Sequence, residues 1–466
     1  MKKNKHYFGI LFLLLPILVW SQNTLTVTNT LNLINQFHPI AKQASLKVEF
    51  SKASLLMNRG AFDPSFYLND NQKTVDGKNY FNYSNPEIKI PTWYGIEIKA
   101  GYENNNGYKL NNEATAGKSS YVGISVPLLK DLLFDKRRSD LAQSKLLVNA
   151  SVHEKQLMLN DLFLDGASAY WSWVFAYQKE QLFKSILINS QNRLNLIKKS
   201  FQSGDVAEVD TVEGLLQLQN LMNLQSQAWS ELKQEQSNLS NFLWDANQIP
   251  YNLNDNVIPD SSWLKANIAG LKIPNLFDLI DSAFLMHPKL SLLKFKSEAL
   301  KIDKKYKTQN LLPTLRINYN FLNKGYEFPN EFNEKLFVNN YKAGIQFGLP
   351  IFLRQARGEL KQANIKIEQN TLEFDQTKLE IENKIKKYYA ELLTLQNQNL
   401  VISSSIEQAK KLVDIELEKY AIGESSLFLV NTRELKYIDV LIKSYELKAK
   451  FFKTFFALNW SKGAII

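Results

Sequence analysis

Few side chains in this sequence of 466 residues have the types and spacing that chemistry requires. The chain has no cysteine, which excludes a thiolate metal site, a cysteine nucleophile and a disulfide framework. Its four histidines have no metal-ligand spacing; they are His6, His38, His153 and His287. The sequence also lacks a glycine-rich phosphate loop, a nucleophile elbow and a His-Glu-x-x-His motif. We therefore expect no enzymatic activity, no cofactor and no metal.

Carboxylates gather beside two glycines, Gly204 and Gly423. The four carboxylates are Asp205, Glu208, Asp210 and Glu424. If several copies of the chain surrounded a pore, each position would form a ring of negative charge that attracts cations at the entrance. The alternative is that these carboxylates act only within their own chain, because acidic side chains also cap a following helix and complement its dipole. Both interpretations place the two glycines where a long helix ends, since glycine accepts the left-handed backbone of a C′ position.

Long helices are predicted on both sides of these glycines. Proline is absent from 128–249 and from 351–466, and apolar residues there recur at steps of 3 and 4, as at Ile381, Ile385, Tyr388, Leu392 and Leu395. Helices are expected over 28–60, 135–202, 207–242, 276–311, 355–419 and 427–458. A helix over 135–202 would be ~100 Å long at ~1.5 Å per residue. Its aromatic residues are expected to pack helix on helix; they are Trp171, Trp173, Phe175 and Tyr177.

The chain contains an internal duplication. His38-Pro39 recurs as His287-Pro288, an offset of 249, whereas Arg138 recurs as Arg357, an offset of 219. The difference, 249 − 219 = 30, indicates about 30 extra residues in the first copy, between Pro64 and Arg138. We therefore predict a signal peptide over 1–21, a first repeat over 22–244, a linker over 245–275 and a second repeat over 276–466.

The first 21 residues are typical of a secretory signal peptide. Three lysines precede an apolar run over 8–20, which is shorter than the ~20 residues that a membrane anchor needs. Removing three lysines lowers the formal charge from +10 to +10 − 3 = +7. The remaining Lys and Arg are scattered rather than clustered, so a nucleic-acid partner is not expected.

Between the short and the long helices, the hydrophobic period changes from 3.6 to 2. Leu315, Ile317, Tyr319 and Phe321 point to one face and polar residues to the other, and segments near 66–68, 122–126 and 343–349 alternate in the same way. Such strands suit a membrane wall between lipid and a wet lumen, or a soluble sheet covered on one side. Four prolines bracket the strand pairs at the helix–strand junctions, namely Pro64, Pro127, Pro313 and Pro350.

Two strand pairs give four strands per chain, which is too few to close a membrane barrel of at least about eight. An unpaired strand edge cannot be satisfied in lipid, so several chains would have to share one barrel. A dimer would supply eight strands and a trimer 12. A further alternating piece at Ile96, Ile98 and Ala100, within the loop 70–119, would either extend a strand or form a hairpin above the membrane.

In their order and repetition, these features resemble the TolC-like outer-membrane efflux protein family. The residues that carry the resemblance are His38-Pro39, Pro64-Ser-Phe, Val126-Pro-Leu-Leu, Arg138-Ser-Asp-Leu-Ala-Gln and Phe201-Gln-Ser-Gly204, with their second copies at 287, 313, 349, 357 and 420. The resemblance implies a mixed α and β fold, mainly α. Long antiparallel helical hairpins would form a periplasmic α-barrel, and four strands per chain would contribute to a shared, 12-stranded outer-membrane β-barrel in a homotrimer.

The same resemblance implies a location in the outer membrane of a Gram-negative bacterium and a passive role as exit duct. Small molecules or exported polypeptide would pass through it in a tripartite efflux or type I secretion system. Gly204, Asp205, Gly423 and Glu424 would form the periplasmic tip that contacts an adaptor (membrane fusion) protein, with an inner-membrane RND or ABC transporter behind it. Family members often carry acidic gate residues after the second tip, but residues 425–432 here contain no carboxylate. The alternative function is a secreted periplasmic coiled-coil scaffold with a small soluble β-subdomain.

Overall fold

A computed structural model describes residues 23–111, 113–326 and 340–464; the predicted signal peptide lies outside them. The chain divides into two compact units, each of which takes residues from both halves of the sequence. Among the described residues, the helical unit comprises 23–37, 166–271 and 395–453, and the sheet unit comprises those within 38–165, 272–394 and 454–464. Since these units do not coincide with the two repeats, the division into repeats stays a prediction from the sequence offsets.

Two helices of 68 residues dominate the chain, α3 (Lys136–Ser203) and α7 (Arg354–Ala421), and each contributes to both units. They are followed by α4 (Glu208–Ser240) and α8 (Leu427–Ser461). The observed starts and ends lie within three residues of the predicted ones. No helix among the described residues is apolar over a long enough stretch to cross a membrane.

The runs 28–60 and 276–311 were each predicted as one helix, and this is wrong. Each is two helices: α1 (Val27–Phe37) and α2 (Pro39–Arg59), then α5 (Leu276–Met286) and α6 (Pro288–Gln309). The break falls at His38 and His287, whose backbones are extended, with ψ of 135° and 122°. In each case the ring Nδ1 accepts a hydrogen bond from the backbone N–H two residues on, at 3.2 and 3.1 Å. The backbone N–H at N1 has no partner within a helix, so a proline there sacrifices no hydrogen bond. The His-Pro pair is therefore well suited to start a helix.

The core of the helical unit is aromatic, as the sequence predicts. Trp173 has no exposed surface and Tyr170 only 2%, and the Tyr170 hydroxyl donates to the Leu25 carbonyl at 2.9 Å. Trp171 stacks on Phe452 with ring centroids 4.3 Å apart. In the same unit β1 (Asn23–Leu25) pairs in parallel with β6 (Val257–Pro259). The segment that contains β6 also carries the short helices η2 (Ser262–Lys265) and η3 (Ile268–Gly270).

The sheet unit shows the duplication in its ion pairs. Lys47 of α2 pairs with Glu154 of α3, and Lys296 of α6 pairs with Glu373 of α7 at 2.8 Å. The two lysines are 249 residues apart and the two glutamates 219, which are the offsets predicted from the sequence. The predicted seam of α7 is buried here too, with Ile385 at 0% and Leu392 at 1% exposure.

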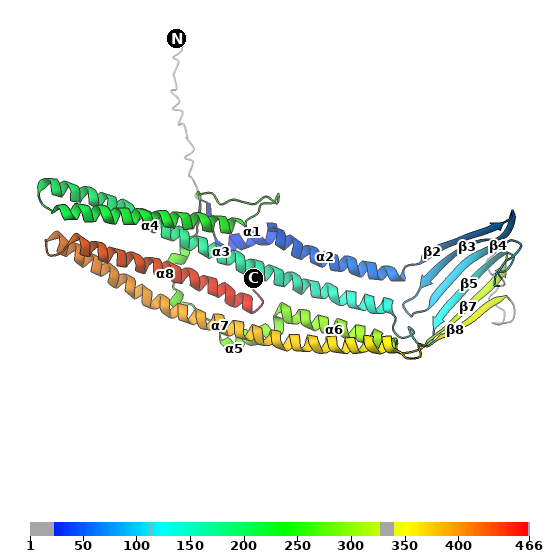
Figure 1. The fold of residues 1–466 in the computed structure, drawn as a ribbon. Helices are drawn as coiled ribbons and strands as arrows, with labels where there is room; N and C mark the ends of the chain where they lie inside the picture. Colours follow the sequence, from blue (N-terminus) through cyan, green and yellow to red (C-terminus); the bar gives the residue numbers. More distant parts are fainter. Residues whose placement is uncertain (1–22, 112, 327–339, 465–466) are drawn as a thin grey trace, which may run out of the picture. The chain divides into compact units, whose positions relative to one another are not determined.

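The sheet of this unit has six antiparallel strands in the order β2-β3-β4-β5-β7-β8, which lie side by side in Figure 1. Their bounds are β2 (Ser65–Val75), β3 (Lys78–Pro91), β4 (Glu97–Asn106), β5 (Gly117–Pro127), β7 (Thr314–Lys324) and β8 (Tyr341–Gly348). The predicted count of four strands is therefore wrong. The extra hairpin β3–β4 accounts for the roughly 30 additional residues of the first copy.

The hairpin is hard to see in the sequence because its alternation is interrupted. Tyr80 and Phe81 are adjacent aromatic residues, and Pro86 stands in the middle of β3. Pro86 has no N–H, and the ladder to β4 skips from Ser84–Asn104 to Glu87–Gly101 around it. Proline inside a strand is an argument against a strand, so the sequence alone left this segment undecided.

Candidate functional site

One face of the six-stranded sheet is apolar in the half that adjoins the helix junctions. The ladders align one row of Ile90, Ile98, Ile124, Tyr319 and Ala343 and a neighbouring row of Phe66, Ile88, Ala100, Val122, Phe321 and Tyr341. Several of these side chains are exposed, among them Phe66 at 67% and Ile124 at 45%. An exposed apolar face across six strands matches the lipid side of a membrane wall.

Toward the far end of the strands, the same face turns polar. Asp70, Ser84, Asn104 and Lys118 form one aligned row, followed by Gln72, Asn82 and Asn106. The turn between β2 and β3 closes this end, with Asp76 and Gly77 both at positive φ, 48° and 72°. The apolar rows are therefore a band of limited height, as a bilayer requires.

The opposite face of the sheet is polar and charged. Glu87 forms an ion pair with Lys89 at 3.0 Å and accepts a hydrogen bond from the Tyr121 hydroxyl at 2.6 Å. Glu97 lies 3.9 Å from Arg316 on β7 and 3.4 Å from Arg137 at the start of α3. Charges of both signs on this face suit a water-filled lumen.

The four prolines lie at or near the ends of strands. Pro64 directly precedes β2 and Pro313 directly precedes β7, whereas Pro127 ends β5 and Pro350 follows β8 by two residues. None of the four removes a hydrogen bond from the middle of the sheet.

The connection from β5 to α3 is held by a residue whose importance the sequence did not reveal. The Arg138 guanidinium donates to the carbonyls of Asp131, Leu132 and Leu133 at 2.5–3.1 Å and to the Asp135 carboxylate at 3.0 Å. Burial raises the pKa of Asp135, but hydrogen bonds from Arg138 and the charges of Arg138 and Arg137 outweigh it and hold the pKa below its ordinary value. The duplicated Arg357 is exposed, so the sequence offset alone could not show this role.

In the helical unit, both predicted helix ends at Gly204 and Gly423 are Schellman turns. Gly204 has φ 82°, with Gly204 N–H bonded to Phe201 O at 3.0 Å and Asp205 N–H to Ser200 O at 2.9 Å. The second turn is the same: Gly423 has φ 80°, and the corresponding bonds run to Tyr420 at 3.1 Å and Lys419 at 2.9 Å. Both glycines are exposed, and no side chain lies within 4 Å of where a Cβ would stand.

The four carboxylates near these turns fall into two groups. Asp205 and Glu424 are exposed residues directly after the glycines, at C″. Glu208 and Asp210 stand in the first turn of α4, where they complement the helix dipole. No ion pair to any of the four exists among the residues that the structure describes. The placement that complements the helix dipole is therefore present at Glu208 and Asp210, whereas neither carboxylate caps α4, because its N-cap residue is Ala207 and no side chain bonds there. The ring of charge stays a prediction because it needs further copies of the chain.

The structure adds a link between the two helical hairpins that sequence reasoning missed. Arg193 of α3 forms a two-pronged ion pair with Glu434 of α8, with one N–O distance of 2.6 Å. The side chains are only 28% and 22% exposed, and the hydrogen bonds to Glu434 raise the pKa of Arg193. Nearby, Asn431 of α8 donates to Glu213 of α4 at 3.2 Å. The partners are 241 residues apart, and no spacing rule connects them.

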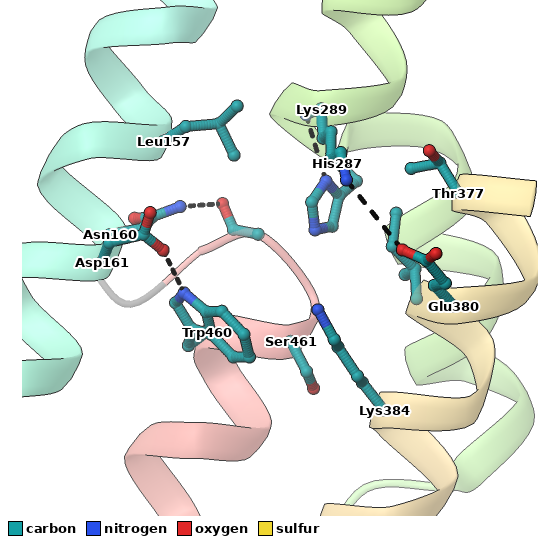
Figure 2. A pocket seen from close by; sticks show the side chains of 12 residues that line it. Leu157, Asn160, Asp161, His287, Lys289, Thr377, Glu380, Lys384, Trp460 and Ser461 are labelled. Carbon is teal, nitrogen blue, oxygen red and sulfur yellow. Dashed lines mark hydrogen bonds and ion pairs between the residues drawn. The ribbon is translucent and has the colours of Figure 1, made fainter. Parts of the chain in front are cut away.

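A polar cavity of about 300 Å³ lies in the sheet unit, beside the start of α6 (Figure 2). Trp460 donates from Nε1 to Asp161 at 2.6 Å, and Lys384 lies over the Trp460 ring at 5.0 Å. Burial, together with the charges of Lys289 and Lys384, lowers the pKa of His287 to about 4. His287 is therefore neutral at neutral pH and keeps Nδ1 free to cap α6. Lys289 forms an ion pair with Glu380 at 4.0 Å, and Asp161 and Lys384 both contact Trp460. Each of these charged side chains therefore has a partner within the cavity, which gives it a structural role.

No group of three or more His, Cys, Asp or Glu side chains among the described residues could hold a metal ion.

Comparisons with known proteins give the fold a context. The family model "Outer membrane efflux protein" matches residues 279–432, and no curated protein matches the chain. The CmeC outer membrane channel of Campylobacter jejuni aligns at a TM-score of 0.65 with 14% identity, over 94% of this chain and 85% of that one. The outer membrane protein VceC of Vibrio cholerae aligns at a TM-score of 0.64 with 11% identity, over 94% of this chain and 96% of that one. The open-state MtrE channel of Neisseria gonorrhoeae aligns at a TM-score of 0.64 with 13% identity, over 94% of this chain and 89% of that one.

These matches confirm the predicted resemblance and the predicted fold class, a mainly helical chain with long antiparallel hairpins and strands. At such low identity the structural likeness shows the fold, while the sequence signature covers the second half of the chain only. The roles of the individual tip residues stay predictions.

Proposed function

We propose, from a fold shared with outer-membrane channels and from the efflux-protein match over residues 279–432, that this chain is an outer-membrane exit duct. It conducts cargo passively and catalyses no reaction. Its cargo is small molecules or exported polypeptide, delivered by an inner-membrane pump of the RND or ABC class.

The observation that carries the proposal is the exposed apolar band on the six-stranded sheet. Ile345, Phe347 and Phe66 are 75%, 64% and 67% exposed on that face, while the other face carries ion pairs. A soluble β-subdomain, as the scaffold alternative requires, would bury such rows under another layer. A lipid bilayer covers them without one, and the sheet's open edges then require several copies, of which we propose three.

Fractionation tests the membrane location. We expect the mature chain in the outer-membrane fraction, released only by detergent and running as a homotrimer in it. A chain that stays in the soluble periplasmic fraction as a monomer would contradict the proposal. Loss of the gene should sensitise cells to toxic compounds or block secretion of a product, and unchanged phenotypes over a broad panel would argue against export.

The turns at Gly204–Asp205 and Gly423–Glu424 are proposed to form the tip that contacts the periplasmic adaptor. Both turns are exposed, both present a carboxylate directly after glycine, and apolar side chains flank them, including Ile422 at 71% and Phe428 at 62% exposure. Since Gly204 and Gly423 have positive φ, a β-branched residue would distort either turn.

The test is capture of the adaptor by Gly204→Val and Gly423→Val variants. Gly77→Val is the matched control, because Gly77 also has positive φ and open space around it but lies in the β2–β3 turn. We expect weaker capture for the two tip variants and normal capture for the control. Undiminished capture by all three would refute the tip role.

A further inference from the structure

The sheet ends in two strands that lack a second neighbour within the described residues, β2 and β8. All neighbouring strands run antiparallel, and the sheet has an even number of strands. β8 of one copy is therefore antiparallel to β2 of the next, so identical chains can continue the sheet without a break in its pattern.

Both edge strands carry part of the apolar band. Leu68 on β2 is 59% exposed, and Ile345 on β8 is 75% exposed. In a bilayer, the free N–H and C=O groups of such edges have no water to bond. The partner that fits these edges is a second copy of this chain, repeated until the ring closes.

The hairpin β3–β4 belongs to the wall and is not an appendage. Its ladder is continuous with β2 on one side and β5 on the other. It follows the same division into faces, with Ile88, Ile90 and Ile98 on the apolar side and Glu87 and Lys89 on the polar side. Each strand has at least ten residues, enough to cross a membrane when tilted.

The turn between β3 and β4 reaches the helix junction. Trp93 stacks on Phe62, next to the start of β2, with ring centroids 4.2 Å apart. A Cβ at Gly95 would lie 2.9 Å from Arg138 Nη2 and 3.0 Å from the Asp131 carbonyl, so the turn packs tightly against the start of α3. The hairpin therefore spans the apolar band from one end to the other, as β2 and β5 do.

We propose that this hairpin widens the membrane pore: a trimer of this chain closes a barrel of 3 × 6 = 18 strands, with β2 and β8 as its subunit interface. The inference rests on the proposed function. With strands ~4.8 Å apart and tilted by ~40°, a 12-stranded ring has a backbone radius of ~12 Å and an 18-stranded ring ~18 Å. The backbone cross-section is then roughly 2.2 times larger, and the exit admits bulkier hydrated cargo than a four-strand contribution would allow.

Thiol labelling on the full-length protein measures this width, since the native chain has no cysteine. Asn318→Cys places a thiol on the polar face of β7, and Ile345→Cys places one on the apolar face of β8 as control. Cells or proteoliposomes are treated with maleimide–polyethylene glycols of graded mass. The size limit at position 318 is then compared between the full chain and a variant lacking residues 76–116, in which β2 joins β5 directly.

We expect the largest polyethylene glycol that labels position 318 to be clearly smaller when the hairpin is removed. The control thiol at position 345 should resist these polar reagents in the full chain and in the deletion variant. Equal size limits in the two proteins would overturn the inference. Electron cryo-microscopy of the full chain in lipid nanodiscs gives an independent answer that does not depend on the deletion variant. Three chains that form an 18-stranded barrel support the inference. A 12-stranded barrel overturns it, whether it comes from two chains or from three chains whose β3–β4 hairpins lie outside the barrel. Failure to enter membranes at all would instead refute the proposed exit duct.

Discussion

Breaking the ion pair between Arg193 and Glu434 should loosen the end of the helical unit near the two turns. The pair joins α3 to α8 by two hydrogen bonds, and both side chains are less than a third exposed. Hydrogen bonds to charged groups contribute about 1.5–3 kcal/mol, so Glu434→Gln should lower the free energy of local opening by that amount. At about 1.4 kcal/mol per factor of ten, amide exchange around residues 193 and 434 should accelerate about 10-fold to 150-fold.

Hydrogen exchange followed by mass spectrometry on the purified protein measures this effect. Asp255→Asn is the matched control, because the Lys233–Asp255 pair lies in the same unit but its aspartate is 74% exposed. Exposed pairs contribute about 0–1 kcal/mol, so exchange near 233 should change less than about fivefold. In the Arg193→Gln/Glu434→Gln double variant, the free energy of local opening should fall by less than the sum of the decreases in the two single variants. If Glu434→Gln accelerates exchange no more than Asp255→Asn does, the pair does not hold the two hairpins together.

Three further predictions concern the core, the helix start and the β5–α3 connection. Trp173→Ala removes a side chain with no exposed surface and should lower the free energy of unfolding by about 3–5 kcal/mol. Trp229 in the same unit is 52% exposed, so Trp229→Ala should change the free energy of unfolding by about 0.5 kcal/mol at most, and thermal melts compare the two variants. The pKa of His287 is lowered to about 4 in the folded chain, so the unfolded chain binds more protons between about pH 6.5 and 4, and stability should fall as pH drops through that window. His287→Asn keeps a helix cap and should flatten this part of the pH profile, and an unchanged slope would contradict the assignment. Arg138→Met should expose the 131–135 connection to proteolysis while Arg357→Met, its exposed counterpart, leaves cleavage unchanged.

The sequence by itself determined the four helices that flank the two turns, α3, α4, α7 and α8, and the turns themselves, and it indicated the duplication. These features depend on local rules: steps of 3 and 4 along α3 and α7, proline at N1 of α2 and α6, and glycine at C′ in both Schellman turns. Each rule acts within about one helical turn, so a single sequence displays it. The structure revealed the Lys47–Glu154 ion pair, and its recurrence as Lys296–Glu373 follows the two offsets, because a duplicated pair of helices repeats its contacts.

Only the tertiary structure decided the number of strands, the Arg193–Glu434 link and the role of Arg138. The β3–β4 hairpin is recognised by the neighbours to which its strands bond, and Pro86 disguises it in the sequence. Arg193 and Glu434 meet because two hairpins pack together, and Arg138 differs from Arg357 because only the first bends back over the carbonyls that precede its helix. Contacts between distant segments depend on how whole elements pack, and residue spacing in one chain does not encode that packing.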